Sequence, residues 1–487
     1  MFSFFSLSTI LFSVIGGIAG LIVGVIPGIG PATLIAVMVP LTLSMSSVDA
    51  IVMLVGMYVG GVSGGMVSAA LLRMPGTPSS IMTTLDAFPM AQRGQPERAL
   101  AICIIASLTG GLIAGLILLL LARPLSIWGT YFGPWEYFAL ITMGLVLMAS
   151  LIRGNMSGGL IAGVLGLLAS VPGVSAADGA LRLDFGIGQL VGGLDTLPVL
   201  LGLFVIGTSL SALLSKEPEV ETVPLTGNAV SGMGAIFKNN RVNLIRSSLV
   251  GAWIGILPGV GASIASTISY SVAKTFHKNG DKFGTGEPGG IIAAESANNA
   301  NVGGALIPLI ALGIPGSAVD AILLGALILH NITPGPLLFT NSPELAWGVV
   351  FSYLFTTILS GVVLFTGMRA FVSLVRVPRE LLYPIMIVFA VLGCYSLRNE
   401  VFDVVVLFIF GILGLIFERL KIPLAPFVIG FVLGGLAETQ LRSALMWSEG
   451  SYLGILERPV AVVFIAIAAA TLLLPPLITR LLRPKPA

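Results

Sequence analysis

Charged side chains are scarce in this chain, where Asp, Glu, Lys and Arg make up 9% of 487 residues. Soluble domains average about 25% charged residues, so this shortage excludes an ordinary soluble protein. Hydrophobic residues reach 56%, and the mean hydropathy is +1.04. A membrane-spanning helix needs about 20 apolar residues, and runs of that length fill most of the sequence. The composition therefore predicts an all-α polytopic membrane protein.

Cysteine and histidine are also rare, with two of each. Cys103 and Cys394 lie in apolar runs, so we expect free thiols and no disulfide framework. His277 in a basic loop and His330 at a helix end do not suggest a metal site. No HExxH, GxSxG, Walker or paired-cysteine motif is present, and we predict no enzyme activity and no cofactor. A net charge of +2 gives no reason to expect nucleic acid binding. Because no basic residue precedes the first apolar run, we expect it to remain as a membrane segment.

Glycine and proline are abundant, and one stretch rich in both occurs twice. The sequence GLIVGVIPGIG at 20–30 reappears as GAWIGILPGVG at 251–261, with four glycines and the proline in register. Proline lacks an N–H group, so each copy should interrupt a helix. Inside a membrane, a broken helix persists only against protein or a polar cavity. Paired broken helices at matching places in two halves are typical of a transporter binding site.

These signals divide the chain into a first repeat at 1–215, a polar cytoplasmic linker at 216–243 and a second repeat at 244–487. Each repeat has a second Pro-Gly break, at Pro75 and at Pro315. We expect helical hairpins at the breaks and roughly 10–12 membrane segments in total. An elevator-like motion of the paired hairpin regions against the remaining helices is the predicted mechanism.

Loop charges predict that the two repeats have opposite orientations. In the first repeat the loop 44–49 has no basic residue and the loop 92–98 is basic, whereas in the second repeat 274–290 is basic and 331–344 has none. Basic residues in short loops favour the cytoplasm, so corresponding loops lie on opposite sides. This is the pattern of inverted-topology repeats, with the N-terminus outside.

The most polar stretch inside an apolar span contains Glu295, Asn298 and Asn299. On a helix these positions share one face, and their oxygens suit a hard cation such as Na⁺. A carboxylate at the bilayer centre costs about 2.5–3.5 kcal/mol, which calls for a role or a partner. Ion binding and plain hydrogen bonding to neighbouring helices both remain open.

Helix N-termini that follow the four breaks would direct N–H groups at one point, where an anion can bind. This predicts an anionic substrate. Ser317 and Asp320 also have the spacing of a capping box, so a structural role stays open there. The predicted substrate contacts are Gly28, Gly30, Thr77, Ser79, Ser80, Gly259, Gly261, Ser263 and Ser317.

Three charged residues next to the breaks are candidate charge partners, namely Arg73, Asp86 and Asp320. Arg73 can pair with a substrate carboxylate, with Asp86, or extend to the interface. Asp86 can contact the site or belong to the loop. Asp320 can cap a helix or couple to an ion.

Several motifs together resemble the large membrane subunit of tripartite tricarboxylate transporters. They occur in order over most of the chain: PGIG at 27–30, PGTPSS at 75–80, LD at 85–86 with PMA at 89–91, AESANN at 294–299, GGALIP at 303–308, GIPGS at 313–317, and LGAL at 324–327 with PGP at 334–336. The resemblance implies a permease of the bacterial inner membrane that is driven by Na⁺ or H⁺. It also implies a periplasmic solute-binding protein that delivers a di- or tricarboxylate, and a small transmembrane subunit.

Three positions depart from the family pattern. Arg73 stands in place of a usual Asn, Ala87 in place of a usual Gly, and Asp320 in place of a usually uncharged residue. Changed charge next to two breaks puts citrate itself in question, though not transport. The alternatives are a carrier of another elevator family or substrate class, and a channel.

Overall fold

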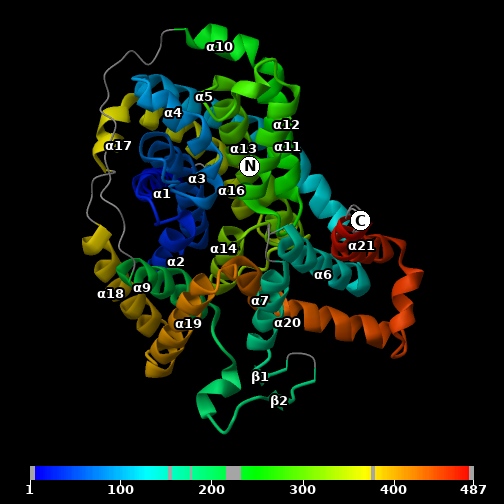
Figure 1. The fold of residues 1–487 in the computed structure, drawn as a ribbon. Coiled ribbons are helices and arrows are strands. Elements are labelled where there is room, and N and C mark those ends of the chain that lie inside the picture. Colours follow the sequence, from blue (N-terminus) through cyan, green and yellow to red (C-terminus); the bar gives the residue numbers. More distant parts are fainter. Residues whose placement is uncertain (1–5, 152–155, 176–177, 215–231, 375–378, 482–487) are drawn as a thin grey trace, which may run out of the picture.

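The structure is a computed structural model that describes residues 6–151, 156–175, 178–214, 232–374 and 379–481 (Figure 1). Its described residues are mostly helical, with one two-stranded antiparallel ladder. Seven helices are long and apolar enough to cross a membrane, and six shorter apolar helices accompany them. The prediction of an all-helical multi-pass membrane protein is confirmed, whereas the number of crossings stays a prediction.

Up to residue 214 the elements are α1 (Leu7–Val25), α2 (Pro31–Thr42), α3 (Ser47–Leu72), η1 (Pro78–Ile81), η2 (Thr83–Leu85), α4 (Ala87–Gln92), α5 (Pro96–Gly129), α6 (Pro134–Leu151), α7 (Met156–Ala169), β1 (Gly173–Val174), β2 (Leu181–Arg182), η3 (Gly188–Gly192), α8 (Thr196–Leu201), η4 (Gly202–Gly207) and α9 (Thr208–Leu214). Most of the predicted linker 216–243 lies outside the described residues.

From residue 232 onward the elements are α10 (Met233–Asn239), α11 (Arg241–Ile256), α12 (Gly261–Phe276), η5 (Gly280–Lys282), α13 (Pro288–Leu312), α14 (Ala318–Leu329), α15 (Leu338–Asn341), α16 (Pro343–Thr366), α17 (Met368–Leu374), α18 (Arg379–Arg398), α19 (Val401–Arg419), α20 (Leu424–Trp447), η6 (Tyr452–Glu457) and α21 (Pro459–Leu481).

The helices break where the repeated Pro-Gly motif predicts. One break separates α1 from α2, and the other separates α11 from α12. Gly28 and Gly259 have φ angles of 87° and 83°, which glycine adopts without the steric cost that a Cβ brings. Both breaks predicted from the sequence are therefore present, whereas hairpins that enter and leave on one membrane face stay a prediction.

A second break follows each central helix, but the chain continues differently after it. Arg73 follows α3 with φ 57°, and Gly313 follows α13 with φ 71°. After Gly313 the chain forms α14, capped by Ser317. After Arg73 it forms only the 3₁₀ turns η1 and η2 and the short α4. The helix expected after the break at Pro75 is thus replaced by 3₁₀ turns.

Small residues let the first two long helices of each half pack with their backbones touching. A Cβ on Gly24 would overlap the backbone of Gly61, and one on Gly255 would overlap that of Asn301. Gly24 in α1 and Gly255 in α11 are 231 positions apart, and their contacts Gly61 in α3 and Asn301 in α13 are 240 positions apart. The packing of α1 on α3 is therefore repeated by α11 on α13.

The next long helix of each half packs on the other half. The long helix α5 runs along α13 and α11, whereas α16 runs along α3 and α1. Gly110 of α5 faces Ser296 of α13, and Gly348 of α16 faces Val52 of α3. This exchange places α3 and α13 at the centre of the bundle (Figure 1).

A second group of helices forms the lower part of the molecule in Figure 1 and includes α6, α7, α19, α20 and α21. Within it α7 packs on α20, and α19 packs on η4. The loop around β1 and β2 is tied to α20 by Arg182–Glu438 (2.6 Å) and Asp178–Arg442 (2.7 Å) ion pairs. Hydrogen bonds from Ser175 and the Ala180 N–H, together with Arg442, lower the pKa of the Asp178 carboxyl to about 2.

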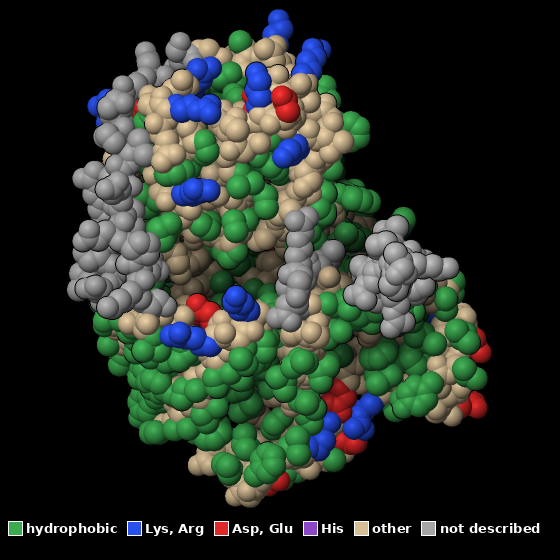
Figure 2. Space-filling view, viewed as in Figure 1, with side chains coloured by type: hydrophobic (Ala, Val, Ile, Leu, Met, Phe, Trp, Pro, Cys, Tyr) green, Lys and Arg blue, Asp and Glu red, His purple; other side chains and the backbone are tan. Residues whose placement is uncertain are grey.

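Lys and Arg side chains gather at the end of the molecule that carries α10 (Figure 2). Lys238 and Arg241 lie there on α10 and α11, and Lys274, Lys278 and Lys282 lie in and after the last turn of α12. Large apolar side chains are exposed on many of the helices, as a lipid-facing surface requires.

Candidate substrate and cation site

Helix α13 carries the polar side chains of the site and is buried from Gly289 to Leu312. Because lipid does not reach it, this helix can hold polar residues that a lipid-facing helix cannot. Glu295, Ser296, Asn298, Asn299 and Asn301 are all buried. The face predicted from the spacing of these residues therefore points into protein.

Glu295 is held from the first half of the chain. The hydroxyl of Thr83, in η2, donates a hydrogen bond to Glu295 Oε1. Among the residues that the structure describes, Glu295 Oε2 and both polar atoms of the Asn298 side chain are buried without a hydrogen-bond partner. Unpaired buried polar atoms cost about 1–3 kcal/mol each, so this group suits a further ligand.

Asn299 lies where the two central helices cross. Ser63 Oγ of α3 donates a 2.8 Å hydrogen bond to Asn299 Oδ1. The Tyr353 hydroxyl lies 3.1 Å from the carbonyl oxygens of both Asn299 and Gly111. Asn299 therefore connects α3, α13, α16 and α5.

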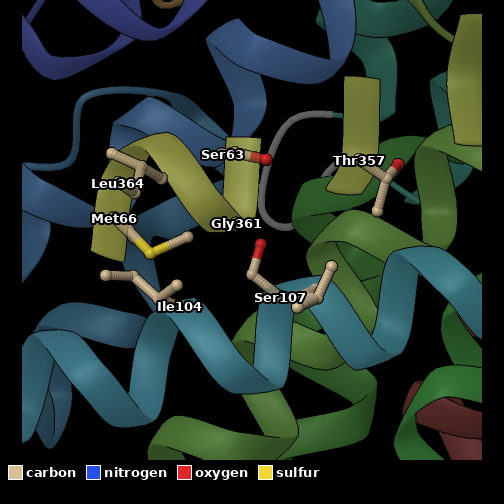
Figure 3. Close-up of a pocket in the computed structure, with 8 residues that line it drawn as sticks. Ser63, Met66, Ile104, Ser107, Thr357, Gly361 and Leu364 are labelled. Atoms are coloured by element: carbon tan, nitrogen blue, oxygen red, sulfur yellow. The ribbon is translucent and has the colours of Figure 1, made fainter. Parts of the chain in front are cut away.

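A cavity of about 10 Å³ adjoins this crossing (Figure 3). Ser63, Ser107 and Thr357 bring hydroxyl groups to its wall from three different helices. This volume is about the least that holds one water molecule. A single small polar guest fits there.

Thr77, Ser79 and Ser80 form a hydroxyl cluster next to α3. The Thr77 hydroxyl lies 2.9 Å from those of both Ser79 and Ser80. A Cβ on Gly65 would come within 2.9 Å of the Thr77 and Ser80 hydroxyl oxygens, so glycine makes room for them. The 3₁₀ turn η1, which begins at Pro78, contacts α12 and α13. This cluster therefore lies on the side of α3 that faces the second half.

Ser317 and Asp320 form a second cluster, with Tyr58 of α3. Asp320 N–H donates to Ser317 Oγ (3.3 Å), and Ser317 donates to Asp320 Oδ2 (2.6 Å). The Tyr58 hydroxyl lies 3.2 Å from Ser317 Oγ. The Ser317 N-cap expected from the spacing is present, and the Asp320 carboxylate accepts from the Ser317 hydroxyl. Within the described residues, Asp320 Oδ1 is buried and has no hydrogen-bond partner.

The two clusters lie at different levels of α3. Tyr58 marks one and Gly65 the other, and seven residues of helix span about 10 Å at 1.5 Å per residue. The hydroxyl residues predicted to surround a single point are therefore distributed over two clusters, with the Ser63–Asn299 crossing between them.

The glycines predicted to contact substrate lie at the helix breaks. Gly30 is the N-cap of α2 and has no side chain to cap it, and the same holds for the start of α12 at Gly261. Gly28 and Gly259 form the turns before these helices. Ser263 is partly buried in the first turn of α12. Backbone N–H groups at the starts of both helices therefore lack a side-chain cap.

Asp86 has a structural place that the sequence did not predict. Its Oδ1 accepts hydrogen bonds from the backbone N–H groups of Gly284, Gly286 and Glu287 at 2.8–2.9 Å. Its Oδ2 accepts one from the Tyr270 hydroxyl at 2.8 Å. This buried carboxylate fastens the first half to the loop before α13. Within the described chain it forms no ion pair with Arg73.

Arg73 is exposed and left-handed at the C-cap of α3, where the equivalent residue of the second half is Gly313. A side chain in this conformation costs about 1 kcal/mol. Among the described residues the guanidinium forms no ion pair.

Four residues that contact the predicted site were not assigned to it from the sequence: Tyr58, Ser63, Thr83 and Tyr353. Ser63 lies in the glycine-rich run of α3, and Thr83 lies just before Asp86. The nearby motifs were a signal that both residues could belong to the site. The hydrogen-bond partners of Ser63 and Thr83, however, lie more than 200 positions away in the sequence. No group of three or more metal-ligating side chains occurs among the described residues.

Broken helices, a buried polar centre and an apolar exterior define an all-helical, multi-pass membrane protein whose polar groups face one another inside the bundle. Residues 10–429 match the model of the tripartite tricarboxylate transporter TctA family. The chain belongs to this family, the membrane component of tripartite tricarboxylate transporters.

Two relatives from Agrobacterium vitis show the extent of the similarity. An uncharacterized 52.8 kDa protein in the TAR-I ttuC' 3' region is 35% identical over 407 residues, which cover 84% of this chain and 81% of the relative. An uncharacterized protein in the TAR-II ttuC' 3' region is 40% identical over 211 residues, 43% of this chain and 87% of the relative. No solved structure matches the chain.

Proposed function

We propose that this chain is the large permease subunit of a binding-protein-dependent tripartite secondary transporter, and that it imports di- or tricarboxylates by Na⁺ or H⁺ symport. The observation that carries the proposal is the set of unpaired polar atoms on α13, at Glu295 and Asn298. Buried between two sets of broken helices, they provide oxygen ligands and negative charge in a place that lipid does not reach.

The coupling cation binds at Glu295, Asn298 and Asn299. Na⁺ prefers several oxygen ligands, and Glu295 Oε2 and Asn298 Oδ1 are available because nothing in the described chain bonds to them. Thr83 fixes the other carboxylate oxygen. A proton on Glu295 would serve the same purpose, so the ion remains either Na⁺ or H⁺.

The substrate carboxylates bind at the helix breaks. Uncapped N-terminal N–H groups of α2 and α12 attract anions. The hydroxyls of Thr77, Ser79, Ser80, Ser263 and Ser317 add neutral donors. The two hydroxyl clusters lie about 10 Å apart along α3. This separation suits a substrate with more than one carboxylate, or two separate carboxylate sites.

The two repeats have inverted topology, and the basic end around α10 faces the cytoplasm. The repeated packing of α1 on α3 and α11 on α13 supports a duplication. The gathering of Lys and Arg at one end (Figure 2) supports the orientation, since basic loops stay inside.

Transport proceeds by an elevator-like motion of the hairpin regions against the other helices. The turn at Pro258 and Gly259 packs on Gly144 and Met148 of α6. The turn at Ile26 and Ile29 packs in one cluster with Tyr383 of α18. Both tips therefore rest on helices outside the hairpin regions, where sliding would occur.

A periplasmic solute-binding protein delivers the substrate, and a small transmembrane subunit completes the assembly in a bacterial inner membrane. Uptake by proteoliposomes tests this. With the binding protein added, uptake should saturate with substrate and depend on an inward Na⁺ or H⁺ gradient.

Two outcomes would favour the alternatives. Full uptake without any binding protein indicates a carrier of another class. Flux that does not saturate and ignores the ion gradient indicates a channel.

A further inference from the structure

A large polar pocket lies away from the transport site, at the basic end where α5, α10, α11 and α12 meet. Its volume is about 750 Å³. Arg98 of α5, Arg246 of α11 and Lys278 after α12 supply cations to its wall, and Asn239, Asn240 and Asn243 supply amides. It is far larger than the cavity at the helix crossing.

The pocket's cations are not neutralised by their neighbours. Arg246 Nη2 donates to Asn243 Oδ1 (2.9 Å), and Arg98 Nη1 donates to Gln95 Oε1 (3.2 Å). The Nε atoms of Arg98 and Arg246 are buried without a hydrogen-bond partner among the described residues. None of the three cations forms an ion pair within that part of the chain.

The other titratable groups in the wall leave the pocket positive. His277 is held by two contacts: its Nδ1 accepts the Asn279 N–H at 3.1 Å, and its Nε2 lies 2.9 Å from Asn240 Oδ1. Glu287 is the one carboxylate that the described residues place in the wall. Three cations against one carboxylate favour an anionic ligand.

An apolar stripe begins directly at the pocket. Val242, Ile245, Leu249 and Trp253 recur every three or four residues along one face of α11, and their exposed fractions are 48–69%. Val242 also lines the pocket, and so does Phe276 at the end of α12, which is 74% exposed. The pocket therefore opens onto a surface that acyl chains can cover.

We propose that this pocket binds an anionic phospholipid, with its phosphate held by Arg98, Arg246 and Lys278 and one acyl chain along α11. A phosphate group accepts bidentate hydrogen bonds from Arg, and the exposed stripe distinguishes a lipid from a soluble anion. Basic pockets between membrane helices are a recognised form of lipid headgroup site.

Thermal unfolding of the purified full chain in detergent tests the proposal. Added phosphatidylglycerol should raise the Tm, whereas phosphatidylcholine and inorganic phosphate at the same concentration should not. The double variant Arg246→Gln with Lys278→Gln should need about 25-fold more phosphatidylglycerol for the same shift, about fivefold for each cation. The matched control is Arg123→Gln with Arg419→Gln, two exposed cations elsewhere, which should respond like the unmodified protein.

Three results would overturn the proposal. The first is an equal response of the two double variants, and the second is an equal response to both lipids. The third is stabilisation by inorganic phosphate that matches that of phosphatidylglycerol, which would make this a site for a soluble anion. If the Arg246 change lowers the Tm without lipid, Lys278→Gln alone carries the comparison, because Lys278 is exposed and makes no hydrogen bond within the described chain.

Discussion

Ser63 and Asn299 join the two central helices, with Ser63 Oγ donating a 2.8 Å hydrogen bond to Asn299 Oδ1. The contact is buried and separated by 236 positions in the sequence. One residue away from it, the side chain of Asn298 has no hydrogen-bond partner among the described residues. Asn299 therefore has a role in assembling the fold, while Asn298 is free to bind an ion.

Asn298→Ala should weaken stimulation of uptake by Na⁺ about tenfold in apparent affinity, the equivalent of about 1.4 kcal/mol. The fold should persist because no described partner loses a hydrogen bond. Uptake measured against Na⁺ concentration checks this. Ser360→Ala is the control, because it also removes a buried polar group without a described hydrogen-bond partner, in this case a hydroxyl. Unchanged Na⁺ dependence would remove Asn298 from the site.

Asn299→Ala should weaken Na⁺ stimulation too, but it should also lower the Tm because Ser63 loses its acceptor.

Glu295→Gln should abolish cation-driven uptake while the protein remains folded, because the amide keeps an oxygen for Thr83 but loses the charge. Asp320→Asn is the matched comparison, since Asp320 is equally buried and has one unpaired oxygen. It should keep most of the uptake, as Ser317 still finds an acceptor. Uptake with and without an ion gradient separates the two. Equal losses would deny Glu295 a special place in coupling.

Gly30→Ala should leave the Tm unchanged and raise the KM for substrate. An added Cβ at Gly30 would meet nothing within 4 Å, and its φ of −85° suits any residue. A methyl group there obstructs only what approaches the N-terminus of α2. Gly24→Ala provides the contrast, because its Cβ would overlap the backbone of Gly61 and should destabilise the fold by about 1–3 kcal/mol. Normal substrate kinetics in Gly30→Ala would place the substrate elsewhere.

Asp86→Asn should lower stability by about 3 kcal/mol, because three backbone N–H bonds lose their charge assistance. Thermal unfolding in detergent measures the effect. Asp281→Asn, in an exposed position of the same loop region, should change little. Lost uptake at an unchanged Tm would instead show that Asp86 acts in transport.

A disulfide between Gly144→Cys and Pro258→Cys should stop uptake, and reduction should restore it. A Cβ on Gly144 would lie 3.0 Å from that of Pro258, close to the spacing that a disulfide requires. Cys103 and Cys394 are replaced by Ala beforehand. Gly361→Cys with Leu108→Cys, whose Cβ atoms would be 3.4 Å apart, links α16 to α5 and should leave uptake intact. Full uptake with the first pair completely oxidised would contradict the sliding motion.

The breaks could be predicted because their cause is local. Proline removes an N–H and glycine permits a positive φ, so the ends of α1 and α11 follow from the residues at Pro27 and Pro258. The face of α13 followed from helical spacing in the same way.

Contacts between distant segments could not be predicted. Asp86 looked like a candidate charge partner, but its hydrogen bonds come from the loop at 284–287 and from Tyr270. Periodicity does not reveal that α5 packs on the second half or that Thr83 reaches Glu295. The shape of η1 and η2 was missed because Thr77-Pro78 also fits the start of an ordinary helix.

The complete burial of α13 also has a consequence for biosynthesis. This helix is not among those whose composition is apolar enough to cross a membrane. Its own contacts with lipid would therefore stabilise it only weakly in the bilayer. It must be accommodated by α5 and α11, its main packing partners, and both precede it in the chain. Substitutions that slow the membrane insertion of α5 or α11 should therefore prevent α13, which carries Glu295, from inserting, even when the sequence of α13 is unchanged.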